Sequence, residues 1–285
     1  MTVKSEDNTL EASSSTEFFK ENGYLIISDF YDVEAEIRPI QEKIQEIVEI
    51  VSAKYGLSAK FRDPAEAMSE GMRRLVAKNR ASAGEVYDAV KQLPAFMRLL
   101  ASKKNEQAYQ ALRQNSTVGI ASGGAGIRID HPNEEKFRAP WHQEFPAQLR
   151  SVDGIVFWSP LVAMEHQLGP VELAVGSHAE GIIPVLRDTS TGQSGAYSLR
   201  LDREQERLAS YSKVSPLSKP GDLILIDFLT LHRSGENCSD RARWSMQFRY
   251  FNFADPTGQK ISWTGSFASG TSFETVLPEL LAENK

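Results

Sequence analysis

The sequence predicts a mainly β protein whose antiparallel core, a barrel or a sandwich, carries a coat of helices. From Ser116 onwards the chain breaks into short β-prone runs that glycine, proline and asparagine punctuate. These runs cover residues 117–120, 126–130, 154–158, 223–226 and 244–250. No helices of about 10–15 residues alternate with them, which argues against a parallel α/β sheet. An antiparallel barrel or sandwich accounts for such strands.

The start of the chain is polar, and the pattern changes at Thr16. Serine, glutamate and asparagine dominate residues 1–15, which leaves little to bury and predicts disorder. Residues 18–22 are then typical of a short helix closed by Gly23, and residues 24–27 of a short strand.

Three longer helices are predicted before the β-prone region. Apolar residues recur at helical spacing over residues 33–54, namely Ile37, Ile40, Ile44, Ile47, Val48 and Val51. A second helix is expected over 64–79, after the turn at Asp63-Pro64. A third is expected over 84–113, with an interruption at Pro94. The front third of the chain is therefore predicted to be a helical scaffold.

We expect one domain over residues 16–285. It would comprise the helical scaffold at about 16–114, a β core at about 115–255 and a C-terminal segment, 256–285, with a short helix near 273–282. Residues 186–215 form a long polar stretch that includes Tyr197. Such a stretch is either a lid or binding loop, or a solvated insertion.

Composition argues against several classes of protein. The formal net charge of −6 argues against a general binder of nucleic acid or of anionic membranes. No apolar run approaches the roughly 18 residues that a membrane-spanning helix needs. Cys238 is the only cysteine, so no intrachain disulfide can form, and the first residues lack an apolar signal core. A cytoplasmic protein with a small-molecule partner is expected; the oligomeric state stays open.

Three residues have the types and spacing of a metal site. His142 and Glu144 are two positions apart, so on an extended segment both side chains leave the same face. His232 follows 90 positions later (142 to 232). Two histidines and one carboxylate on one face of a metal leave the opposite positions open, which is the facial triad of non-haem iron(II) oxygenases.

Arg243 lies 11 positions after His232 (232 to 243), in a β-prone run. An arginine there could hold a co-substrate carboxylate with two parallel bonds; the alternative is a surface ion pair. If its strand is regular, alternate side chains share faces. The polar face holds Arg243, Ser245, Gln247 and Arg249, and the apolar face holds Trp244, Met246, Phe248 and Tyr250. Arg249 either faces the pocket or forms a buried ion pair; Arg128 either faces the site or forms a cross-strand salt bridge.

From about Glu17 to Asp255 the chain resembles the phytanoyl-CoA dioxygenase family of iron(II)/2-oxoglutarate oxygenases. The resemblance rests on residues 18–26, 141–144, 158–161, 169–178 and 232–243. It implies a double-stranded β-helix, the jelly-roll or cupin-like core, with N-terminal helices packed outside. It implies that His142, Glu144 and His232 bind Fe(II), and that Arg243, Ser234 and Trp158 hold 2-oxoglutarate, with O2 as the oxidant. One departure is Glu144, where most of the family has aspartate.

The resemblance further implies hydroxylation of an unactivated carbon, coupled to decarboxylation of 2-oxoglutarate to succinate. The substrate is predicted to be a small polar metabolite, with anionic ones such as sugar acids or amino-acid derivatives among the candidates. The residues expected to contact it are Arg128, Arg249, Gln247 and Tyr197. Two alternatives stay open: a non-oxidative metal-dependent epimerase or isomerase, and a binding module without turnover.

Overall fold

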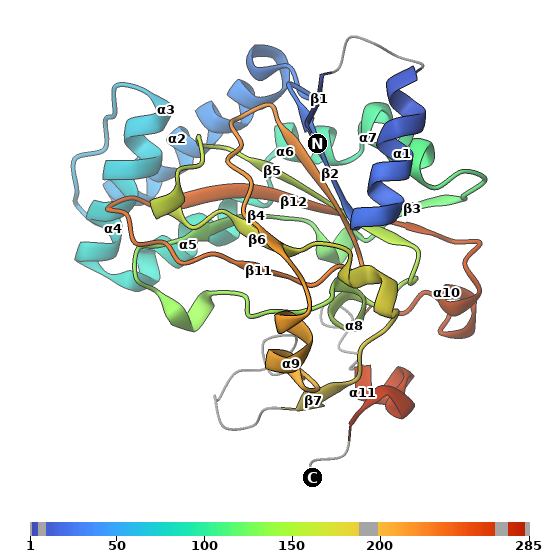
Figure 1. Cartoon of the computed structure of the whole chain (residues 1–285). Helices are drawn as coiled ribbons and strands as arrows, with labels where there is room; N and C mark the ends of the chain where they lie inside the picture. Colours follow the sequence, from blue (N-terminus) through green and yellow to red (C-terminus); the bar gives the residue numbers. More distant parts are fainter. Residues whose placement is uncertain (1, 5–9, 188–198, 266–272, 283–285) are drawn as a thin grey trace.

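A seven-stranded sheet runs through the centre of the molecule (Figure 1). The computed structural model describes residues 2–4, 10–187, 199–265 and 273–282. The strand order is β1-β2-β10-β5-β12-β3, and β4 pairs with the other end of the same edge of β12. Apart from the parallel pair of β1 and β2, neighbouring strands of this sheet are antiparallel. Its strands are β1 (Thr2–Lys4), β2 (Tyr24–Ser28), β3 (Val118–Ile120), β4 (Gly126–Asp130), β5 (Gly154–Pro160), β10 (Leu223–Asp227) and β12 (Arg243–Asn252).

A second, smaller antiparallel sheet packs over one face of the large one. Its order is β11-β6-β9, from β11 (His232–Ser234), β6 (Val171–Ala174) and β9 (Lys213–Val214). Val171 and Leu173 of β6 share a buried apolar cluster with Trp158 and Ile224 of the large sheet. A separate hairpin joins β7 (Val185–Arg187) and β8 (Leu199–Leu201). Two facing antiparallel sheets confirm the predicted jelly-roll core, and within the described residues they do not close into a barrel.

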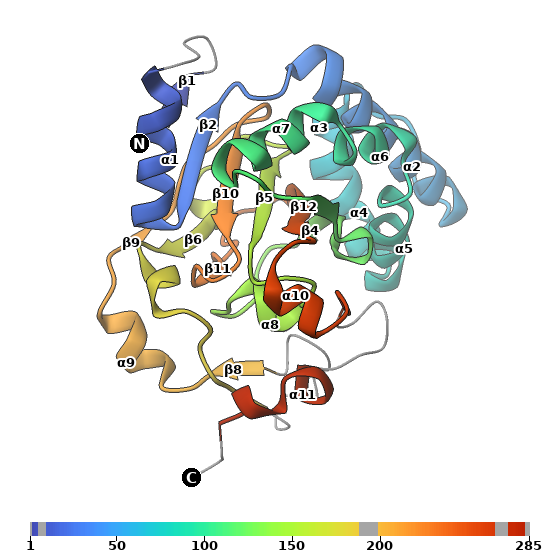
Figure 2. The same ribbon diagram turned by 90° about the vertical axis from the view of Figure 1, so that its right-hand side faces the viewer.

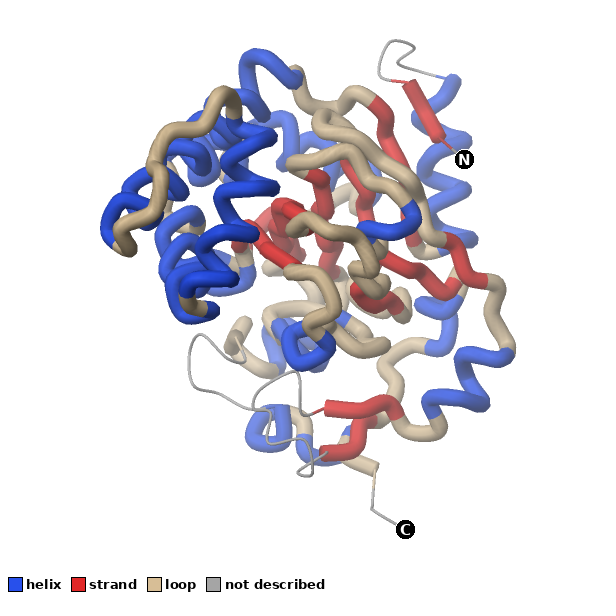
Figure 3. The backbone as a smooth tube through the Cα atoms, turned by 90° about the vertical axis from the view of Figure 1, so that its left-hand side faces the viewer, coloured by secondary structure: helices blue, strands red, loops and turns tan. Residues whose placement is uncertain are grey.

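Helices cover the opposite face of the large sheet. Figures 2 and 3 show α2 to α6 gathered on one side of the strands. Because side chains alternate along a strand, Leu223 and Leu225 of β10 pack with Ile40 and Ile44 of α2, whereas Ile224 and Ile226 face the small sheet. The helices are α1 (Leu10–Asn22), α2 (Arg38–Lys54), α3 (Pro64–Glu66), α4 (Met72–Lys78), α5 (Arg80–Val90), α6 (Pro94–Leu100), α7 (Lys103–Leu112), α8 (Glu144–Gln148), α9 (Glu204–Ala209), α10 (Pro256–Lys260) and α11 (Phe273–Val276).

The predicted helical scaffold is present, with one extra break. A π-helical turn, Val33–Ile37, leads into α2 and completes the expected helix over 33–54. Another, Ala67–Gly71, joins α3 to α4 across the expected range 64–79. The third predicted helix is three helices. Pro94 begins α6, as expected, but a second break precedes α7, where the Ser102 side chain caps the helix by accepting from Asn105 N–H.

Disorder is predicted for residues 1–15, of which the structure describes residues 2–4 and 10–15. Residues Thr2–Lys4 form β1, which pairs with the edge of β2, and α1 already begins at Leu10. The composition argument weighs only what side chains can bury, whereas β1 is held by main-chain bonds to a strand edge that any sequence can make. None of the helices in the described part of the chain is both long and apolar enough to cross a bilayer.

We expect Phe248→Ala to destabilise the fold strongly. Phe248 is fully buried between the large sheet and the helices, 5.4 Å from the ring centroid of Phe96. Removing such a ring costs about 3–5 kcal/mol of unfolding free energy. Urea unfolding of wild type and variant measures it. Ile50→Ala, at a side chain that is 65% exposed, is the control and should change stability by no more than about 0.5 kcal/mol. Equal effects of the two substitutions would contradict the assigned core.

Candidate active site

His142 and His232 are joined by an isolated antiparallel bridge. His142 N–H donates to His232 O over 3.0 Å, and His232 N–H donates to His142 O over 3.1 Å. Residues that exchange both bonds project their side chains to the same side of the sheet. The two imidazole rings accordingly lie side by side, with centroids 4.3 Å apart. The backbone thus brings together two histidines that are distant in the sequence.

Both imidazoles have a fixed tautomer. Nδ1 of His142 lies 2.8 Å from Pro140 O, and Nδ1 of His232 lies 2.9 Å from Thr230 O. A carbonyl oxygen can only accept, so each Nδ1 carries the proton and each Nε2 presents a lone pair. Burial and the neighbouring His142 lower the pKa of His232, which favours its neutral form. Neutral imidazoles held in this way are the usual form of histidine metal ligands.

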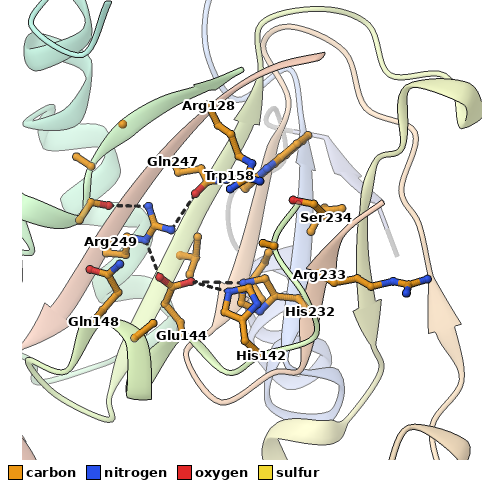
Figure 4. Close-up of a pocket in the computed structure, with 18 of the residues that line it drawn as sticks. Arg128, His142, Glu144, Gln148, Trp158, His232, Arg233, Ser234, Gln247 and Arg249 are labelled. Carbon is orange, nitrogen blue, oxygen red and sulfur yellow. Dashed lines mark hydrogen bonds and ion pairs between the residues drawn. The ribbon is translucent and has the colours of Figure 1, made fainter. Parts of the chain in front are cut away.

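The carboxylate of Glu144 completes the cluster, although not from an extended segment as predicted. His142 and Gln143 are extended, and α8 begins at Glu144 itself. The side chain still reaches back, so that Oε2 lies 3.8 Å from Nε2 of His142 and 3.4 Å from Nε2 of His232 (Figure 4). Gln143 points away, as expected, and accepts from Ile183 N–H.

These three atoms fit a metal ion. One ligand atom from each residue lies within 4.8 Å of the other two. All three are acceptors, and Oε2 of Glu144 is buried without a hydrogen-bond partner among the described residues. Three acceptors without a hydrogen between them repel one another, and a buried acceptor without a partner is costly. A bound cation removes both penalties, which makes the arrangement a candidate site for iron(II).

The second oxygen of the same carboxylate is held by Arg249. Nε of Arg249 donates to Oε1 of Glu144 over 2.9 Å, and Glu144 is only 1% exposed. Burial raises the pKa of Glu144, but the charge of the Arg249 guanidinium opposes it, and that pKa lies well below its usual range. The carboxylate is therefore ionised, as a metal ligand must be.

The cluster lies in a cavity of about 680 Å³ lined by both sheets. The predicted residues that line it are Arg128, Trp158, Ser234, Arg243, Gln247 and Arg249, together with the three presumed ligands. Tyr197, the remaining predicted residue, lies outside the described part of the chain. Sequence reasoning did not single out Gln148 of α8 or the glycine-rich segment 123–126, both of which line the cavity. The close spacing of Gly123, Gly124 and Gly126 could have indicated that this segment lines a site. No feature of the sequence around Gln148 indicated the same.

The two faces of β12 divide as predicted. Arg243, Gln247 and Arg249 line the cavity, whereas the alternate residues Trp244, Met246, Phe248 and Tyr250 belong to the core under the helices. Arg243 is 2% exposed, which excludes the alternative of a surface ion pair. Its nearest acid is Asp130, directly opposite on β4, at 2.8 Å from Nη2.

Asp130 also binds Arg128, a partner that sequence reasoning did not assign. Nε of Arg128 donates to Oδ1 of Asp130 over 2.8 Å. The ion pair is thus between neighbours on one strand, not across strands as the alternative for Arg128 supposed. Burial raises the pKa of Asp130, but Arg128 and Arg243 outweigh it and lower that pKa overall. Two guanidinium groups therefore share the carboxylate of Asp130.

A jelly-roll core with two histidines and a carboxylate in its cavity defines the class of non-haem iron oxygenases. The chain belongs to the phytanoyl-CoA dioxygenase (PhyH) family, whose model matches residues 19–245. The prediction of an iron(II)/2-oxoglutarate-dependent enzyme is thereby confirmed. A comparison with curated proteins gave no match.

Solved structures share the fold at low sequence identity. The epimerase SnoN, in complex with Fe3+, alpha ketoglutarate and nogalamycin RO, is 14% identical with a TM-score of 0.54, and 87% of each chain is covered. The carbocyclase SnoK is 14% identical with a TM-score of 0.55, covering 88% of this chain and 87% of its own. EctD from S. alaskensis, with 2-oxoglutarate and 5-hydroxyectoine, is 16% identical with a TM-score of 0.55, covering 88% and 80%.

We expect His142→Ala or His232→Ala to weaken Fe(II) binding by more than about 100-fold, since even the outer partners of metal ligands are worth about 10–100-fold. Anaerobic titration with Fe(II) measures the affinity, and thermal unfolding of the apoproteins should show little change. His166→Ala, at an exposed histidine outside the cavity, is the matched control. Wild-type iron affinity in either ligand variant would remove that histidine from the site.

Proposed function

We propose that this enzyme binds Fe(II) through His142, Glu144 and His232 and hydroxylates an unactivated carbon of a small polar metabolite. The observation that carries the proposal is the convergence, inside the cavity, of two unprotonated Nε2 atoms and Oε2 of Glu144, which has no hydrogen-bond partner in the described part of the chain. When bound, iron with 2-oxoglutarate and O2 supplies the oxidising chemistry, and 2-oxoglutarate leaves as succinate. The protein supplies orientation, charge and exclusion of water.

Arg243 is the residue best placed to bind the distal carboxylate of 2-oxoglutarate. Asp130 engages the Nε–Nη2 edge of its guanidinium, and Nη1 donates to Gly235 O over 3.4 Å. One hydrogen is left on each of Nη1 and Nη2, so a second carboxylate would meet that end. Ser234 and Trp158, both buried on the cavity wall, would add a hydroxyl and an apolar surface that keeps water out.

The remaining wall of the cavity favours a polar substrate over a strongly anionic one. Arg249 binds Glu144 and Lys91 binds Asp88, and the guanidinium of Arg233 points away from the metal ligands (Figure 4) and binds Glu172. Two amides, Gln148 and Gln247, and the main chain of the glycine-rich segment 123–126 also line the cavity. Amides recognise hydroxyl, amide and carbonyl groups by hydrogen bonds without a charge. These features support the neutral end of the predicted range of metabolites.

A 2-oxoglutarate-dependent epimerase is the second candidate, because SnoN, which shares the fold, is described as one. Hydroxylation adds one oxygen atom to the substrate, whereas epimerisation leaves the composition unchanged. Mass spectrometry of the product therefore separates the two. The convergent ligand atoms count against a binding module without turnover.

We expect purified, iron-loaded protein to release succinate from 2-oxoglutarate above its uncoupled background when a polar metabolite from a panel is its substrate. The product should gain one oxygen atom, and label from 18O2 should appear in it. Glu144→Ala protein is the control and should release none above background. Product of unchanged mass would favour the epimerase. Binding of a metabolite without any 2-oxoglutarate consumption would favour the non-oxidative epimerase if the metabolite changes configuration, and the binding module if it does not change.

Arg243→Ala should raise the apparent constant for 2-oxoglutarate by about 30-fold or more. Leaving one member of a buried charge pair alone costs roughly 2–5 kcal/mol, and about 1.4 kcal/mol corresponds to a factor of ten. Arg243→Lys should recover only part, because an ammonium group cannot make two parallel bonds. The measurement is initial rate against 2-oxoglutarate concentration.

Fe(II) affinity should hardly change in either variant, since the ligands are untouched. Arg62→Ala, at a side chain that is 79% exposed, controls for loss of positive charge. An unchanged 2-oxoglutarate constant in Arg243→Ala would assign the co-substrate to another basic residue, with Arg128 first in line.

A further inference from the structure

Arg249 donates hydrogen bonds to three other residues of the protein. Besides Oε1 of Glu144, it donates through Nη1 to Gly124 O over 2.6 Å and through Nη2 to Gln247 Oε1 over 2.8 Å (Figure 4). Its side chain is 12% exposed. All three nitrogens of the guanidinium are therefore anchored, by groups from three separate segments of the chain. An anionic substrate would have to displace one of these partners in order to bind Arg249.

The geometry points to a positioning role: Arg249 holds Oε1 so that Glu144 offers the metal one oxygen, Oε2. This inference rests on the proposed metal site. The two histidines and one oxygen of Glu144 would take three positions of a bound iron and leave the others for 2-oxoglutarate and O2. A carboxylate bound through both oxygens would take a fourth position, and either the co-substrate or O2 would lose its place. The ion pair with Arg249 prevents this.

The same ion pair explains why residue 144 is a glutamate. Its carboxylate must reach the two imidazoles with Oε2 and Arg249 with Oε1 at the same time. An aspartate is shorter by one methylene, about 1.5 Å of bond length, and its carboxylate could keep one of these partners but not both. Glu144 and Arg249 are thus a matched pair, and their effects on metal binding should not be additive.

Gly124 packs against the side chains of Gln148 and Arg249. A Cβ atom on Gly124 would lie 2.5 Å from Oε1 of Gln148 and 3.3 Å from Cδ of Arg249. Gly124 is thus in close contact with both side chains, and its carbonyl oxygen accepts from Nη1 of Arg249. The glycine-rich segment therefore belongs to the support of the metal ligand as well as to the cavity wall.

The test is a double-substitution cycle of Arg249→Gln and Glu144→Asp, with Fe(II) affinity measured by anaerobic titration of each protein. In the wild-type background, Arg249→Gln should weaken Fe(II) binding by about 10–100-fold, the usual effect of losing a partner of a metal ligand. In the Glu144→Asp background, where the pair is already broken, the same substitution should change affinity by less than about threefold. The visible charge-transfer band of the iron–2-oxoglutarate complex should weaken or shift in Arg249→Gln.

Arg249→Lys keeps the charge and much of the volume, and should restore part of the affinity and of the band. If thermal unfolding shows that Arg249→Gln does not fold, Arg249→Lys takes its place in the double-substitution cycle. Arg62→Gln is the surface control. Equal losses in both backgrounds, or no loss in either, would overturn the positioning role while leaving the proposed function standing. Absence of Fe(II) binding in wild type would instead remove the proposed function itself.

Discussion

The backbone bridge between His142 and His232 is the constraint on which the site depends. Its two hydrogen bonds join the chain before α8 to the first residue of β11. The opposite face of the bridge is fastened as well, because the Arg233 guanidinium lies 5.0 Å from the ring centroid of Trp141 and binds Glu172 on β6. With both faces held, the imidazoles keep their spacing before any ion binds. Preorganisation of this kind spares a ligand the cost of ordering its own site.

Charge pairing is the second constraint, and β12 provides its basic half. Arg243 and Arg249 leave the same face of this strand and reach Asp130 and Glu144. An isolated buried charge is costly, so each acid needs its guanidinium to remain ionised. The opposite face of the same strand anchors the core under the helices. A single strand thus connects the stability of the fold to the electrostatics of the cavity, and the alternation of side chains keeps the two tasks apart.

Local sequence patterns were enough to predict many of the helices, strands and site residues of this protein. The helical periodicity of residues 33–54, the alternation along 243–250 and the β-prone runs after Ser116 are properties of neighbouring residues, so they could be recognised without the fold. The identities of His142, Glu144, His232 and Arg243 as site candidates also came from spacing and residue type, helped by the family resemblance. In each case the feature that was recognised is a buried face or a set of ligand atoms. The residues that form it lie close together in the sequence or belong to a known motif.

Only the tertiary structure decided which residues are partners. Spacing does not show that Asp130 lies opposite Arg243, because strand register is set by packing, and a slip of one residue would turn every side chain to the other face. Composition likewise does not show that residues 2–4 find the edge of β2. Local sequence also does not show that α8 begins at Glu144. The bond from Arg249 to Oε1 of Glu144 joins residues that are 105 positions apart (144 to 249). Such pairings depend on where the whole chain places its strands, which no local stretch of sequence specifies.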